Sequence, residues 1–171
     1  MNTNYRHIID IIHQLGIAFQ EIDHMESHSC DESKVLRSRA NMDGVGSKNL
    51  VFHAKGHFFL VTTTGDTQIK ARNFKHEFGS KDIRFASQEE ITNLMQATIG
   101  SIPPFGFENK TLPIYVDSGI FGSENFCFNP NDPTKSIQIR TKDLRTIYDT
   151  LPNPVRYFKQ TEEGFDILED V

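Results

Sequence analysis

The sequence predicts an α+β fold in which a mixed β-sheet curls into a partial barrel and helices pack outside it. Short apolar, β-rich segments predict the strands, and residues 50–54 and 58–63 flank Lys55-Gly56 as the arms of a hairpin. Segments with apolar residues at helical spacing are mixed with these strands along the chain. A chain of 171 residues can bury a sizeable core, and we expect one domain over residues 1–171.

The N-terminal part predicts two helices with a strand between them. Residues 4–15 place isoleucines and leucines at helical spacing, and residues 17–22 alternate as a short strand. The second helix, over residues 29–40, begins at a serine or aspartate that can cap it. Residues 41–46 contain two glycines and predict a flexible turn before the hairpin.

The middle of the chain predicts a short helix, a strand and a capped helix. Residues 68–79 end at a glycine and favour a short helix, and residues 82–86 favour a strand. Ser87-Gln88-Glu89-Glu90 is a capping box, and Ile91, Leu94 and Met95 form the inner face of the helix that it starts. This helix leads the chain into an unusual loop.

That loop, residues 99–107, reads IGSIPPFGF. Two consecutive prolines fix φ and lack backbone donors, and the glycines allow angles that other residues avoid. The apolar residues distinguish the segment from a solvated linker. We interpret it as a rigid, partly buried loop that presents backbone amides to a ligand; a stiff connector is an equally good interpretation from these residues alone.

The C-terminal part predicts three strands, a last helix and a tail. The strands are expected over residues 114–117, 124–128 and 136–140, and the helix over 141–151, where a Pro-Asn-Pro sequence stops it. The tail, residues 158–171, is acidic, and we expect it to fray.

The totals exclude several classes of protein. No apolar run approaches the roughly 20 residues that span a bilayer, and the N-terminus does not open a secretory signal, so we expect no membrane association. Two cysteines form no disulfide framework, which favours a reducing cytoplasm. The net charge of −5, without a Lys/Arg block, predicts only a small footprint on any nucleic acid: an end or a single nucleotide.

Metal and nucleophile chemistry are both disfavoured. His53 and His57 flank the hairpin turn and His24 and His28 share a loop, but neither pair has a closely spaced third ligand. Cys127 lies between two phenylalanines as an apolar filler. Lys48 is the most informative charge, because it follows a glycine-rich turn and precedes an apolar strand. It can reach a bound anion at the sheet end or be a solvated strand-start lysine.

Three segments, in order, resemble the YbaK/prolyl-tRNA synthetase-associated domain family. Residues 44–50, GVGSKNL, are similar to its G-x-G-[AST]-K-[NT]-L segment, and residues 83–87, IRFAS, to the strand and helix start before its loop. Residues 100–106, GSIPPFG, resemble its G-x-x-x-P-F-G loop. The resemblance covers about residues 15–151. It implies a mixed sheet forming a pseudo-barrel with surrounding helices, no cofactor, and hydrolysis of wrongly charged aminoacyl-tRNA.

The resemblance also implies roles for particular residues. Lys48 would contact the phosphate or ribose of the terminal adenosine, and the Gly100 and Ser101 amides would lie near the ester carbonyl. Asn129 would position water or bond the amino-acid side chain. The substrate-binding residues expected around these are Ser47, Asn49, Ile102, Pro104, Phe105, Gly106, Cys30 and Glu32. For Glu32, which could bind the substrate ammonium, a solvated helix N-terminus is the alternative.

One departure concerns the substrate. The alanyl-tRNA(Pro) deacylase branch of the family has His-Pro after its late strand, where this chain has Asn129-Pro130. Asn129, the following KSI (residues 135–137) and the doubled proline are more similar to the YeaK-type branch, which implies tRNA charged with serine, threonine or alanine. The expected partners are the acceptor end of mischarged tRNA and an aminoacyl-tRNA synthetase. The alternative function is a domain that binds aminoacyl-tRNA or a synthetase without hydrolysing the ester.

Overall fold

The computed structural model describes residues 2–27 and 29–169. Within this part of the chain there are four α-helices: α1 (Thr3–Gln14), α2 (Cys30–Arg39), α3 (Gln88–Met95) and α4 (Thr141–Thr150). The strands there are β1 (Gln20–Asp23), β2 (Val45–Ala54), β3 (His57–Thr64), β4 (Ile83–Phe85), β5 (Ile114–Asp117), β6 (Asn125–Phe128), β7 (Lys135–Arg140), β8 (Val155–Gln160) and β9 (Phe165–Leu168). Two short 3-10 turns occupy Ala71–Phe74 and Ser118–Gly122.

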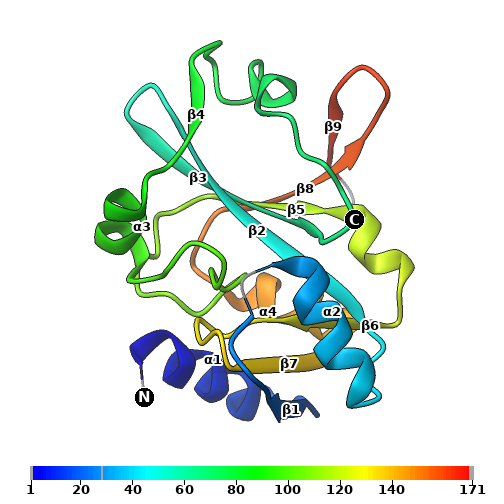
Figure 1. The fold of residues 1–171 in the computed structure, drawn as a ribbon. Helices are drawn as coiled ribbons and strands as arrows, with labels where there is room; N and C mark the ends of the chain where they lie inside the picture. The colour runs from blue at the N-terminus through cyan, green and yellow to red at the C-terminus, as the bar shows by residue number, and fades with distance from the viewer. Residues whose placement is uncertain (1, 28, 170–171) are drawn as a thin grey trace.

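The strands form one mixed sheet, which confirms the predicted fold class. Their order is β1-β7-β6-β2-β3-β5-β8-β9, with β4 paired to β2 outside this path. The β2–β6, β3–β5 and β5–β8 pairs are parallel and the others antiparallel. Figure 1 shows β2 crossing the molecule as the long strand that joins the two halves of the sheet.

The predicted hairpin is β2–β3, and its two-residue turn has Lys55 at φ 51° and Gly56 at φ 75°. Positive φ at both central residues suits the twist of the flanking strands. However, β2 begins earlier than predicted, at Val45. The expected turn over residues 41–46 is wrong in its last two residues, because Val45 and Gly46 pair in parallel with Phe126 and Cys127.

The capping box at α3 is confirmed: the Ser87 side chain accepts from the Glu90 amide, and the Glu90 carboxylate accepts from the Ser87 amide. Arg84 on β4 donates to both oxygens of Glu90, at 2.6 and 3.0 Å. These bonds, those from Arg84 first, lower the pKa of Glu90 to about 2. The chain is therefore fixed on both sides of the turn between β4 and α3.

The short helix expected over residues 68–79 is wrong. Only the 3-10 turn at Ala71–Phe74 forms, followed by isolated turns that end at Gly79. The side chains of Phe74 and Phe78 are buried in an aromatic core with Phe52, Tyr115 and Phe158. Packing of these rings against the sheet decides the backbone here, in place of helical propensity.

The acidic tail does not fray in the part that the structure describes. β8 and β9 form an antiparallel hairpin from Tyr157↔Leu168 to Gln160↔Phe165. The ring centroid of Phe165 lies 4.4 Å from that of Phe74, so the hairpin closes the aromatic core. Alternating apolar residues outweigh the acidic composition of the segment. Residues 170–171 of the predicted tail lie outside the described residues.

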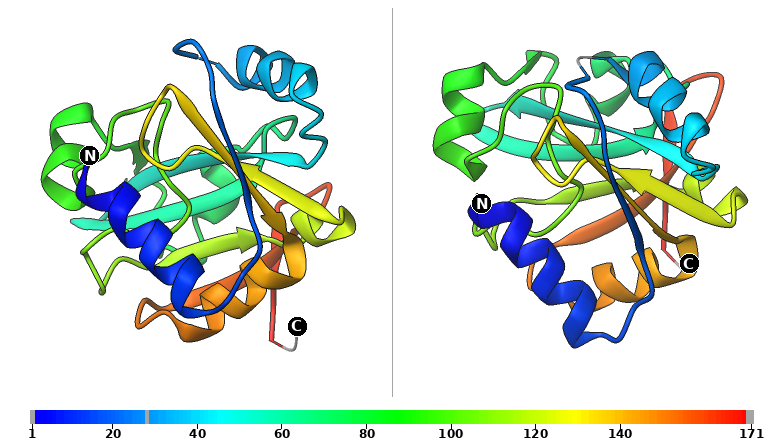
Figure 2. Two further views of the ribbon diagram at one scale, coloured as in Figure 1. Left: turned by 90° about the horizontal axis from the view of Figure 1, so that it is seen from below. Right: turned by 60° about the horizontal axis from the view of Figure 1, so that its bottom comes forward.

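A second, larger core joins the helices to the other face of the sheet. Ile8 and Ile12 of α1 and Leu144 and Ile147 of α4 are fully buried in it. Figure 2 shows α1 and α4 as neighbours at one end of the molecule and α2 at the opposite end. The α2 end contains the candidate site.

Candidate functional site

A cavity of about 530 Å³ lies beside a gap in the sheet. On the side of β2 away from β3, β6 pairs only at Val45 and Gly46, and β4 pairs only from Phe52 onward. Between these two partners, none of the described strands lies beside residues 47–50 of β2 on that edge. The cavity is lined by this stretch, by α2, by residues at the β4–α3 junction and by the start of the 99–107 loop.

Lys48, which is expected either to reach a bound anion or to be a solvated strand-start lysine, lines this cavity. It lies opposite Thr63 in the β2–β3 register, and its ammonium donates to the Thr67 carbonyl at 3.4 Å. Side chains alternate along a strand, which places Lys48 and Asn49 on opposite faces of β2. The two neighbours therefore meet different parts of the site.

Asn49 connects β2 to the loop. Its amide nitrogen donates to the Ile102 carbonyl at 3.0 Å and to the Ser47 hydroxyl at 3.2 Å. Its oxygen accepts from the Thr62 hydroxyl at 2.8 Å. Ser47, Asn49 and Ile102 all line the cavity. The two hydrogen bonds of the Asn49 amide nitrogen therefore hold the loop at a fixed distance from β2.

The loop presents only its first half to the cavity. Ile99, Gly100 and Ile102 line it, whereas Ser101 does not. The Ser101 amide donates to the Thr98 carbonyl at 2.9 Å, and its hydroxyl bonds the same oxygen at 3.3 Å. The Ser101 amide, which was expected near the ester carbonyl, is therefore already bonded within the loop and lies outside the cavity lining. The Gly100 and Ile102 amides have no hydrogen-bond acceptor among the described residues.

Pro104, Phe105 and Gly106 were expected to bind substrate, but they support the loop from behind. Phe105 is fully buried, with its ring centroid 5.2 Å from that of Phe128. The Tyr148 hydroxyl donates to the Pro104 carbonyl at 3.1 Å. Gly106 has φ +93°, and a Cβ there would overlap Ile8 of α1. Core packing, which a local motif does not reveal, places these residues away from the cavity.

At the start of α2, only one of the two residues expected to bind substrate, Cys30 and Glu32, lines the cavity. Cys30 is exposed and lines the cavity. Glu32 is exposed and does not line it; its amide donates to the Ser29 hydroxyl at 3.1 Å as part of the helix cap. The alternative interpretation of Glu32, a helix N-terminus, agrees with this geometry.

Asn129 lines the cavity just after β6. Its oxygen accepts from the Asp132 amide at 2.8 Å, and its NH₂ group has no acceptor among the described residues. The preceding Phe128 pairs with Ile137, so Ser136 lies across from Asn129 at the next position. An amide donor and a hydroxyl therefore adjoin each other on one wall.

Sequence reasoning missed a serine–histidine pair on this wall. Ser136 lines the cavity, is only 2% exposed, and its hydroxyl lies 2.9 Å from His24 Nε2. His24 Nδ1 lies 2.8 Å from the Met25 carbonyl, which requires a proton on Nδ1. In the neutral imidazole Nε2 then carries no proton and accepts from the Ser136 hydroxyl. Such a pair can relay a proton, and nothing in the sequence spacing of the two residues indicates it.

Arg37 of α2 was also missed. It lines the cavity at 8% exposure, and its guanidinium packs on Gly46, where a Cβ would overlap Nη2. It also acts on Cys127 of β6: burial raises the pKa of that thiol to about 11, and the Arg37 charge opposes the rise. The G-x-G sequence therefore gives room for an arginine side chain from the neighbouring helix.

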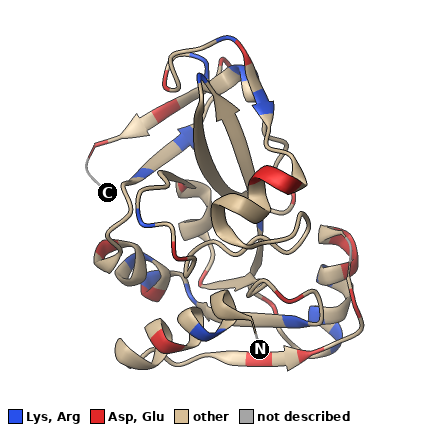
Figure 3. Ribbon diagram, turned by 90° about the vertical axis from the view of Figure 1, so that its left-hand side faces the viewer, with Lys and Arg blue, Asp and Glu red and all other residues tan. Residues whose placement is uncertain are grey.

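The charges of the cavity are few and mixed. Lys34, Arg37 and Lys48 line it together with Asp43 and Asp66, and Lys34 lies 3.9 Å from Asp66. In the view of Figure 3 basic and acidic residues are interspersed over the ribbon. No group of three or more His, Cys, Asp or Glu side chains that could hold a metal ion occurs among the described residues. His28, whose pairing with His24 was disfavoured as a metal site, lies outside them.

Phe85 and Ile99 complete the lining with exposed apolar surface. They are 57% and 56% exposed, and the Phe85 ring stacks on Phe52 with centroids 4.9 Å apart. An exposed, supported aromatic ring beside a cavity can stack on a flat ligand such as a nucleobase.

Comparison with known proteins identifies the family. Residues 33–147, well over half of the chain, match the family model of the aminoacyl-tRNA editing domain. The chain belongs to this family, which confirms the resemblance seen in its motifs. Editing by such domains is hydrolysis of the ester of a mischarged tRNA, so the predicted enzyme class is confirmed at the level of the family.

Individual relatives agree with this assignment. The chain is 24% identical over 144 residues to the prolyl-tRNA editing protein ProX of Acetoanaerobium sticklandii, covering 82% of this chain and 87% of the relative. It is 26% identical over 151 residues to the multifunctional Ser/Thr-tRNA deacylase ProXp-y of Escherichia coli, covering 85% and 89%. A solved structure described as a proposed trans-editing enzyme for prolyl-tRNA synthetase shares the fold, with a TM-score of 0.71, 20% identity, and coverage of 91% and 96%.

Within residues 2–27 and 29–169, none of the helices has the length and apolar character needed to cross a bilayer.

Proposed function

We propose that the cavity binds the acceptor end of tRNA mischarged with serine, threonine or alanine and hydrolyses its aminoacyl ester. The observation that carries this proposal is the convergence of Lys48, Gly100 and Asn129 on one cavity beside the gap in β2. A cavity of about 530 Å³ is within the range of small-ligand sites, roughly 300–1,000 Å³, and suits one nucleotide with its amino acid.

Three groups place the terminal adenosine. Lys48 contacts its phosphate or ribose, and the adenine lies against Phe85 and Ile99. Stacking on an aromatic ring is tolerant of sequence and requires no basic surface. This agrees with a chain of net charge −5 that grips one nucleotide in place of a long stretch.

The ester lies against the first half of the loop. Water attacks the carbonyl carbon, and negative charge develops on the carbonyl oxygen before the bond to the ribose oxygen breaks. Preorganised backbone amides are the natural stabilisers of that charge. The Gly100 and Ile102 amides, which have no other acceptor among the described residues, take this role, and Asn49 holds Ile102 in place at 3.0 Å.

The amino acid lies toward Asn129 and Ser136. The NH₂ group of Asn129, which has no acceptor among the described residues, donates to the hydroxyl of a seryl or threonyl side chain and so favours these substrates over alanine. An amide is a poor general base, so Asn129 positions its partner only. The proton of the attacking water passes to the Ser136 hydroxyl, which gives its own proton to His24 Nε2, and the same pair returns a proton to the ribose oxygen as the ester bond breaks. The free ribose hydroxyl can relay the proton between them. Support for serine and threonine also comes from the named activity of the ProXp-y relative.

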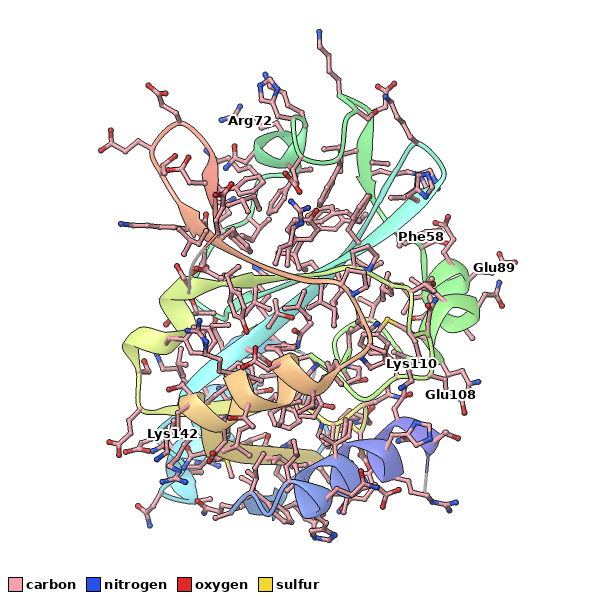
Figure 4. All side chains as sticks on the ribbon, turned by 180° about the vertical axis from the view of Figure 1, so that it is seen from behind. Phe58, Arg72, Glu89, Glu108, Lys110 and Lys142 are labelled. Atoms are coloured by element: carbon pink, nitrogen blue, oxygen red, sulfur yellow. The ribbon has the colours of Figure 1, made fainter. Side chains whose placement is uncertain are left out.

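The test is deacylation of a panel of charged tRNAs carrying serine, threonine, alanine or proline. We expect Lys48→Ala to lower the rate on the best substrate about 10- to 100-fold, because a charge-assisted contact is lost. Lys142→Ala is the control: Lys142 is exposed at the start of α4 and does not line the cavity. Figure 4 labels it near the edge of the molecule. Wild-type rates equal to the rate without protein contradict the proposal. Tight binding with an unchanged ester half-life would assign the non-catalytic alternative.

A further inference from the structure

Arg37 is a largely buried charge that forms no ion pair with any described residue, although Asp43 and Asp66 line the same cavity. Only 8% of the residue is exposed, and none of the described residues forms a salt bridge with its guanidinium or accepts a hydrogen bond from it. Among the described residues, the Tyr157 hydroxyl is the only side-chain nitrogen or oxygen that is both fully buried and without a hydrogen-bond partner. The guanidinium nitrogens of Arg37 also have no partner, so they are not fully buried. The guanidinium therefore opens to the cavity that Arg37 lines.

Two features show that this placement is built into the fold. Gly46 has no side chain, and any Cβ there would overlap Arg37 Nη2. The Gly46 carbonyl accepts from the Gly65 amide at 2.8 Å, which fixes the backbone under the guanidinium. An unpaired buried charge destabilises the free protein, so its presence here indicates an anionic ligand that completes it.

The chemistry of the substrate identifies that ligand. Resting on the proposed function, we propose that Arg37 binds the phosphate of the 3′-terminal nucleotide of the aminoacyl-tRNA. The amino acid itself offers no anion, since its carboxyl group is esterified and its ammonium is repelled by a guanidinium. The phosphate is the one anionic group at this end, and the planar fork of arginine matches two phosphate oxygens. Lys48 then contacts the ribose, the second of its two expected partners.

The experiment combines two substrates with four proteins. The substrates are the 2′(3′)-O-seryl ester of AMP and the same ester of adenosine, which lacks the phosphate. The proteins are wild type, Arg37→Gln, Arg37→Lys and Arg39→Gln. Arg39 is the matched control because it lies two residues away on α2 and is exposed.

We expect wild type and Arg39→Gln to prefer the AMP ester by about 10- to 100-fold in kcat/KM, mainly through KM. Arg37→Gln removes this preference and equals wild type on the adenosine ester. Arg37→Lys keeps part of it, because it keeps the charge without the fork. The melting temperature of Arg37→Gln should equal or exceed that of wild type, since an unpaired charge is removed.

Three results would overturn the phosphate assignment. One is an Arg37→Gln loss of equal size on both esters, which would place Arg37 at the carbonyl. Another is a preference for the AMP ester that survives in Arg37→Gln. The third comes from a binding experiment.

If wild type hydrolyses neither ester, binding of AMP and of adenosine is measured by NMR titration. AMP-specific binding that Arg37→Gln abolishes keeps the phosphate site while the proposed hydrolysis fails; equal binding of the two ligands rejects the site.

Discussion

At the scale of single residues, the cavity combines buried polar groups with an exposed aromatic ring. Phe85 stands 57% exposed on β4 although its ring stacks on the fully buried Phe52. A single exposed aromatic side chain is common on protein surfaces and needs no functional explanation. This ring, however, lines the same cavity as the polar side chains of Lys48, Asn49 and Asn129. That combination suits a nucleotide, which has a flat base at one end and polar groups at the other.

Phe85→Ala is expected to raise KM for the seryl ester of AMP about tenfold and leave kcat nearly unchanged, because a stacking contact with adenine is worth roughly 1–3 kcal/mol. Phe19→Ala serves as the control, since Phe19 is also exposed, at 37%, and does not line the cavity. The measurement is steady-state hydrolysis. An equal effect of the two substitutions would remove Phe85 from the site.

At the scale of elements, the 99–107 loop is held in shape by side chains from other parts of the chain. Gln88 of α3 accepts from the Ile99 amide at 2.8 Å, and Asn49 of β2 donates to the Ile102 carbonyl. Tyr148 of α4 donates to the Pro104 carbonyl, and His7 Nδ1 of α1 lies 3.2 Å from the Gly106 carbonyl. Three helices and one strand thus fix a segment that has no regular structure of its own. Figure 4 shows Lys110, whose ammonium donates to Phe107, just beyond it.

The two glycines of this loop provide a matched pair of substitutions. Both have φ +93°, but a Cβ at Gly100 meets open space whereas one at Gly106 overlaps Ile8. Gly100→Ala should destabilise the protein by about 1–2 kcal/mol through backbone strain alone. Gly106→Ala should add about 1–3 kcal/mol more from overpacking. Urea denaturation measures both, and equal losses would mean that α1 does not restrict Gly106.

At the scale of the whole molecule, the site exists because β6 and β4 pair with the same edge of β2 and leave residues 47–50 open between them. The loop, α2 and α3 close that opening into a cavity. Its lining contains both signs of charge, and basic and acidic residues are interspersed over the ribbon in Figure 3. On the proposed function, we therefore expect recognition of tRNA to depend on the shape of one cavity and not on a broad basic face.

This arrangement predicts a weak dependence of tRNA affinity on salt. With one or two phosphate contacts, the slope of log K against log salt is about −0.7 to −1.4, which is a loss of about 3- to 7-fold between 50 and 200 mM. Fluorescence titration with a non-hydrolysable aminoacyl-tRNA analogue measures it. A loss of about 10³-fold would instead indicate a large phosphate footprint.

The sequence by itself determined the helices, the hairpin, the capping box and the motif segments, because each depends on residues close together in the chain. It also placed Lys48, Gly100 and Asn129 in one proposed site through the family resemblance. Tertiary structure decided what depends on distant packing. It turned Ser101, Pro104 and Phe105 away from the cavity, paired Ser136 with His24, and folded the acidic tail into a hairpin. It also brought Arg37 of α2 onto Gly46 of β2, because only the folded chain sets which helix covers which strand.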